Sequence, residues 1–129
     1  MTPDRGQALV EFALVLPILL ALALAIAELS EVGVARLALA HAAAEGARAG
    51  ALTNDDREVR ASVDAAAAPL DPTRLEITID PPEPQRGSDP RGTLLRVHLG
   101  YAVAAPLSFL GLPAFVVRGD AARLVEWTP

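Results

Sequence analysis

The sequence contains no cysteine and no lysine among its 129 residues, and only 4% of them are aromatic. Without cysteine, neither a disulfide framework nor a thiolate metal site can form. The basic residues are all arginine, and the net charge of −5 argues against a protein that binds nucleic acid through its phosphates. The length allows one small domain together with an anchor, but not two domains that each have a full hydrophobic core.

The apolar residues, 52% of the chain, are concentrated towards the N-terminus. Residues 8–27 form a run of 20 residues that only Glu11 interrupts with a charge. As a helix this run would be about 30 Å long, which matches the hydrocarbon core of a bilayer. Three interpretations fit it. The run could be a plain transmembrane anchor or a secretory signal peptide cleaved before Glu28. The third interpretation is a prepilin-type signal, which loses a short polar leader and keeps its apolar helix.

Glu11 separates these interpretations, because an acidic residue in a membrane segment is costly and a signal peptide gains nothing from it. Cleavage after Gly6 would give Gln7 a free ammonium group. Glu11 lies four residues further on, about 6 Å of helical rise away and on nearly the same face. Its carboxylate could then pair with its own terminus or with that of a neighbouring subunit. Because an unpaired charge in a low dielectric is worse than a buried pair, Glu11 is interpreted as an assembly device.

The start of this segment, Gly6 followed by "QALVEF" and a long apolar helix, resembles the TadE-like minor pilins (pseudopilins) of tight-adherence, or Flp, pilus systems. That family has a recurrent "G-x-A-x-V-E-F" start and a proline within the apolar run, here Pro17. The resemblance implies that a prepilin peptidase cleaves between Gly6 and Gln7. It also implies that Glu11 and Phe12 take part in assembly.

The helical pattern continues beyond the apolar run to about Asn54, with one polar face and one narrow apolar face. The polar face carries His41, Glu45 and Arg48, and the opposite face carries Val32, Leu39, Ala43, Gly46 and Gly50. The two glycines either let a second helix approach closely or accept the chain's own head domain. The stretch "AAAEGARAGAL" is also similar to the corresponding part of TadE-like proteins.

The remaining residues predict a small α+β head with a roughly three-stranded, mostly antiparallel sheet that rests on the long helix. We expect a short helix over residues 55–68, capped by the acidic residues at its start, and strands over residues 75–80, 94–103 and about 114–126. The polar loop 81–92 should be exposed and mobile. The apolar loop 104–113 either packs on its own sheet or contacts a partner.

No pattern in the sequence indicates an enzyme or a cofactor. His41 and His98 have no third ligand at a spacing suited to a metal ion. Nucleophile motifs and phosphate-binding loops are also missing. Asp55 and Asp56 are more simply explained as a helix cap than as a metal pair.

The predicted organisation is a leader at residues 1–6, a transmembrane helix at 7–27, its continuation at 28–52 and a head at 53–129. The predicted function is that of a TadE-like minor pilin, processed after Gly6 and held in the cytoplasmic membrane with an extracytoplasmic head. The resemblance implies a prepilin peptidase, other pilins or TadE-like proteins, and the Tad secretion machinery as partners. The alternative is an extracytoplasmic binding module that uses the same segment as an anchor or a removable signal.

Overall fold

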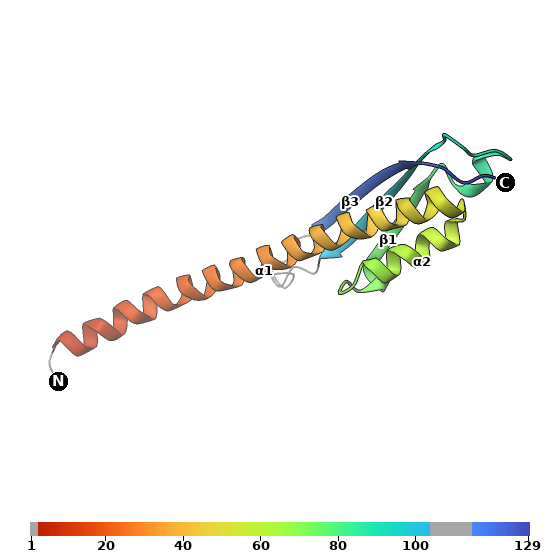
Figure 1. Cartoon of the computed structure of the whole chain (residues 1–129). Coiled ribbons are helices and arrows are strands. Elements are labelled where there is room, and N and C mark those ends of the chain that lie inside the picture. Colours follow the sequence, from red (N-terminus) through yellow and green to blue (C-terminus); the bar gives the residue numbers. More distant parts are fainter. Residues whose placement is uncertain (1–2, 104–114) are drawn as a thin grey trace. The chain divides into compact units, whose positions relative to one another are not determined.

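The computed structural model describes residues 3–103 and 115–129, with side chains from Gly6 onward. The chain divides into two compact units, residues 1–31 and 32–129. One helix, α1 (Pro3–Thr53), contributes residues to both units. Figure 1 labels the helices and strands on the ribbon, which is coloured from the N-terminus to the C-terminus.

The described part of the first unit is helical throughout, and its side chains from residue 6 to residue 27 are all exposed. They are overwhelmingly apolar, and an 18-residue window of the helix reaches a mean hydropathy of 2.7. Pro17 lies inside the helix without ending it. So much exposed apolar surface on one helix needs an apolar environment, and its length and composition suit a membrane span.

The second unit begins with the rest of α1, which ends where Asn54 takes a positive φ of 53°. The Asn54 N–H donates to the Gly50 carbonyl (3.0 Å), which closes the last turn in the left-handed geometry that asparagine tolerates. Helix α2 (Asp56–Ala66) follows at once, with the Asp55 carboxylate accepting from the Arg57 N–H at its N-terminus (2.7 Å). The predicted acidic cap is confirmed, and the helix ends two residues earlier than expected.

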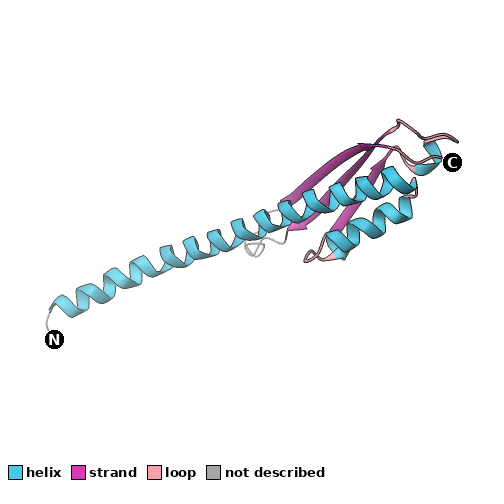
Figure 2. Cartoon of the chain, in the orientation of Figure 1, coloured by secondary structure: helices cyan, strands magenta, loops and turns pink. Residues whose placement is uncertain are grey.

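Three antiparallel strands complete the unit in the order β1 (Leu75–Asp80), β2 (Leu94–Val103) and β3 (Phe115–Leu124). The helices α2 and α1 lie along one face of this sheet (Figures 1 and 2). Two short 3-10 turns, Pro72–Arg74 and Glu83–Gln85, flank β1. The predicted α+β fold with a three-stranded antiparallel sheet is therefore confirmed.

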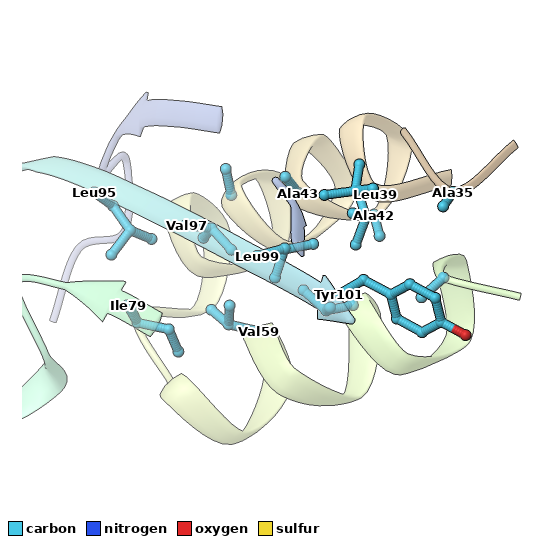
Figure 3. Close-up of a cluster of buried hydrophobic side chains, with 14 of the residues drawn as sticks. Ala35, Leu39, Ala42, Ala43, Val59, Ile79, Leu95, Val97, Leu99 and Tyr101 are labelled. Atoms are coloured by element: carbon cyan, nitrogen blue, oxygen red, sulfur yellow. The ribbon is translucent and has the colours of Figure 1, made fainter. Parts of the chain in front are cut away.

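The core of the head lies between β2 and the two helices (Figure 3). Strand β2 alternates between buried and exposed positions, because one face of the strand meets the helices and the other does not. Its buried side chains are those that the sequence pattern predicted: Leu95, Val97, Leu99, Tyr101 and Val103. Leu39 of α1 and Val59 and Val63 of α2 fill the space opposite them.

The connection between β1 and β2 is mostly exposed, as the sequence predicted, but it contains two buried residues. Arg86 is only 5% exposed, and Pro90 is fully buried. The sequence could not show this burial, because the partners of Arg86 lie about 30 residues earlier in the chain. The predicted apolar loop at 104–113, with Leu107, Phe109, Leu110 and Leu112, lies outside the described residues.

Candidate functional site

The first candidate site is the start of α1, where one polar contact links Gln7 and Glu11. The Gln7 Nε2 donates to the Glu11 Oε1 across one turn of helix (3.3 Å), and both residues are exposed. The helix thus places position 7 and the Glu11 carboxylate on the same face, which is the spacing expected for residues i and i+4. Any positive charge created at residue 7 would lie one helical turn from a carboxylate.

Gly6 lies within α1 rather than before it, because the helix already begins at Pro3. A Cβ at position 6 would meet no described atom within 4 Å apart from its chain neighbours and the backbone of its own helix, so Gly6 is sterically open. Phe12 is 61% exposed beside Glu11. The segment therefore presents a small residue, a carboxylate and an aromatic ring without intramolecular cover from described residues.

The second pair of predicted residues, Gly46 and Gly50, contacts the chain's own head. A Cβ at Gly46 would lie 2.5 Å from the Val63 Cγ2, and a Cβ at Gly50 would lie 2.7 Å from the Val59 Cγ2. At Gly50 it would also collide with the Leu95 side chain. The glycines let α1 approach α2 and β2 closely, which is the second of the two readings that the sequence left open.

Sequence reasoning missed a buried cation at the end of the head. The Arg86 guanidinium donates to the Pro81 carbonyl (2.9 Å), to the Asn54 side chain (3.0 Å) and to the Asp56 carboxylate. Asp56 and Glu83 add a reciprocal pair, in which each carboxylate accepts from the other's backbone N–H. This network ties the α1–α2 turn to the β1–β2 connection and is structural in character.

The sheet face away from the helices carries a polar hollow over Gly100, between Glu76 and Arg118. Beside it the His98 Nδ1 lies 2.6 Å from the Asp120 Oδ1, because the two residues are direct cross-strand partners. His98 is exposed, as the sequence predicted, but its partner depends on strand register. No chemistry follows from this pair alone.

Three carboxyl groups in the head have a pKa below the ordinary value of 3.8. The Arg57 backbone N–H and then the Arg57 side chain lower the pKa of Asp55, and the Thr73 hydroxyl and N–H lower that of Asp71. The guanidinium of Arg91 lowers the pKa of Asp89. Each group caps or braces a local turn, so these shifts indicate local structure rather than catalysis.

Among residues 3–103 and 115–129, no group of three or more histidine or acidic side chains could hold a metal ion. The ionisable residues described above instead pair within the head or face solvent. The features that remain as a functional candidate are therefore the apolar helix and the Gln7–Glu11 pair at its start.

Comparison with known proteins supports this choice. Residues 6–48, which are 43 of the 129 residues, match the family model described as TadE-like protein. No curated protein and no solved structure matches the chain. The matched segment begins at Gly6 and includes Glu11 and Phe12, so the resemblance inferred from the sequence is confirmed. Residues 6–48 are thus similar to TadE-like proteins, and the apolar helix within them suits a single-pass membrane anchor.

Proposed function

We propose that the chain is a minor pilin or pseudopilin that is cleaved after Gly6 and takes part in assembling a Tad pilus. The observation that carries this proposal is the contact between Gln7 and Glu11 at the start of an exposed apolar helix. Cleavage before Gln7 would replace a neutral amide nitrogen by an ammonium group, one turn from the Glu11 carboxylate.

The new charge explains why an acidic residue is tolerated at this position. A carboxylate among lipid tails is costly when it is alone, whereas a nearby ammonium group satisfies it. In a single subunit the pair stays close to the membrane surface. In an assembly, Glu11 of one subunit can bind the terminus of the next, which favours helices packed side by side in a fixed register.

The proposal assigns the membrane helix to residues 7–27 and places the head, residues 53–129, outside the cytoplasm. It implies a prepilin peptidase that removes residues 1–6, and it implies other pilins or TadE-like proteins as assembly partners. Support comes from the family match, which covers both the cleavage site and the apolar helix.

The mature N-terminus tests the processing step. Mass spectrometry of protein purified from its own host should find a chain that begins at Gln7. A chain that begins at Glu28 would show a removable signal peptide, and an intact Met1 would show a plain anchor. Either of those results would contradict the proposal and favour the extracytoplasmic binding module.

Substitution of Glu11 tests the assembly step. We expect Glu11→Ala to insert into the membrane normally, while incorporation into pili falls by about tenfold or more, because an unpaired charge in low dielectric costs several kcal/mol. Glu31→Ala is the matched control, since Glu31 is an exposed acid of the same helix beyond the apolar run. Equal assembly by both variants, measured in sheared pilus fractions, would refute a role for Glu11.

A further inference from the structure

The head carries a groove between the start of its α1 segment and the start of β3. Its lining is Val32 and Arg36 from α1 and Phe115, Val116, Val117 and Arg118 from β3. Phe115 is 57% exposed and Val116 is 60% exposed. An exposed aromatic ring next to an exposed valine is unfavourable in water, so this surface is a candidate contact.

The chemistry of the groove combines apolar side chains with positive charge. Both charged residues of its lining are arginines, and no acidic residue lines it among the described part of the chain. Arginine binds phosphate through a planar fork of donors, while its alkyl stem lies along apolar surface. Segments that lie in the membrane interface combine Lys or Arg with Trp, Phe or Leu. The same combination of groups suits a phospholipid surface.

The groove also lies within reach of the membrane by chain length alone. Val32 follows the apolar run 8–27 by only five residues, which rise about 7.5 Å as a helix and span about 17 Å at most when extended. The headgroup layer on each side of a bilayer is about 5–7 Å thick. Val32 therefore stays close to the headgroups in any orientation of the head.

We propose that this groove docks on the phospholipid headgroup surface of the bilayer, with Phe115 and Val116 at the interface and Arg36 and Arg118 on lipid phosphates. This inference rests on the proposed membrane anchoring of residues 8–27. Glu28 and Glu31 precede the groove without lining it. Arg118 also borders the polar hollow on the outer face of the sheet, which Glu76 and Asp120 line. These four carboxylates offset the charges of the two arginines. Docking therefore needs the phosphodiester of any phospholipid rather than an excess of anionic lipid. It would hold the head of an unassembled subunit on the membrane.

The absence of cysteine makes the test direct, because a single introduced cysteine can be labelled without background. The full-length protein is reconstituted at one copy per nanodisc of phosphatidylcholine that contains a lipid with a nitroxide quencher on its headgroup. A fluorophore is attached at Val116→Cys. The matched reporter is Leu124→Cys, because Leu124 is 56% exposed on the same strand, eight residues and about 27 Å away.

We expect the fluorophore at position 116 to be quenched about threefold more than that at position 124, since headgroups would contact only one end of β3. Replacing one fifth of the lipid by phosphatidylglycerol should leave this ratio nearly unchanged. The double substitution Phe115→Ser and Arg118→Ala should abolish the difference. The control pair Leu94→Ser and Arg123→Ala, an exposed apolar residue and an exposed arginine outside the groove lining, should preserve it.

Equal quenching at positions 116 and 124 would overturn the inference, as would an unchanged ratio in the groove variant. A difference in quenching between positions 116 and 124 that develops only in discs with two copies would overturn it in favour of a second copy of the chain. A third reporter, Ala21→Cys, separates this inference from the proposed function. If quenchers on the acyl chains reach position 21 while position 116 is not quenched, anchoring holds and only the docking fails. If position 21 is also inaccessible to them, the anchoring itself fails.

Discussion

Gly119 of β3 lies so close to Leu39 of α1 that a Cβ atom at position 119 would sit 2.7 Å from the Leu39 Cβ and 2.9 Å from its carbonyl oxygen. Both distances are shorter than real contacts of such atoms. Because part of the obstacle is helix backbone, it cannot turn away as the tip of a flexible side chain can. The absence of a side chain at Gly119 therefore sets how closely α1 and the sheet pack.

Gly119→Ala should destabilise the head by about 1–3 kcal/mol, because the added methyl overpacks this contact. The control is Gly100→Ala on the neighbouring strand, where a Cβ would meet nothing closer than 3.8 Å and should cause little change. Urea unfolding of the full-length protein in detergent, followed by the fluorescence of its single tryptophan, Trp127, measures both. Equal stability of the two variants would refute the close contact.

Removal of the buried cation should also destabilise the head. In Arg86→Ala the Asp56 carboxylate loses its ion-pair partner and keeps only the Glu83 N–H, and the carbonyl of Pro81 loses a donor. Asp56 keeps some contact with water, so we expect a loss of about 2–3 kcal/mol, at or below the lower end of the range for buried ion pairs. Arg91→Ala removes an exposed arginine that pairs with Asp89 and should change the unfolding midpoint little. If Arg86→Ala lowers the unfolding free energy as little as Arg91→Ala does, the Arg86 network does not stabilise the head.

The cap of α2 predicts how stability depends on pH. The folded pKa of Asp55 lies below its ordinary value of 3.8, first because of the Arg57 backbone N–H and then because of the Arg57 side chain. A depressed pKa contributes stability that is fully present above the unfolded value and is lost as pH falls through the folded value. Asparagine also caps helices well but does not titrate there.

The measured quantity is the difference in unfolding free energy between the natural chain and Asp55→Asn. It should be constant from pH 7 to about pH 5 and should shrink below pH 4, as Asp55 becomes protonated. Asp64→Asn in the same helix changes the net charge equally without touching the cap, and its difference serves as the reference. If the two differences follow the same pH course, the cap is not responsible.

The effect of replacing a glycine of α1 by alanine should depend on what surrounds that glycine. Gly46→Ala places a methyl against Val63 and should lower the stability of the head by about 1–3 kcal/mol. Gly33→Ala adds a methyl in open space and should stabilise the helix by about 1 kcal/mol. Thermal unfolding followed through Trp127 compares the two variants. A Gly46→Ala chain of normal stability that fails only in assembly would instead assign this glycine to contacts between subunits.

Much of the fold follows from local patterns. Apolar and polar residues alternate in Leu75–Asp80 and in Leu94–Val103, and this alternation predicted both strands with the observed bounds. Successive side chains of a strand point to opposite faces of the sheet, so a sheet with one covered face requires an apolar residue at every second position. The apolar helix and the TadE-like segment were evident for the same reason, since both depend on residues that are close in sequence.

Long-range contacts account for what the sequence did not show. Arg86 looked like a loop residue because its partners Asn54 and Asp56 are about 30 positions away. The pairing of His98 with Asp120 depends on the register between β2 and β3, and no single residue in the sequence indicates that register.

By itself, the sequence determined the helix that is apolar enough to span a membrane and the position of Glu11 within its apolar run. It also determined the family resemblance and the type of each main element. Hydropathy and periodicity act between near neighbours, so they can be read along the chain. Only the tertiary structure decided that Gly46 faces α2, that α1 packs directly against Gly119 and that Arg86 is buried. Each of these features depends on which segment, distant in sequence, packs against the residue. Because the interior is close-packed, the positions of all these segments are fixed together when the domain folds.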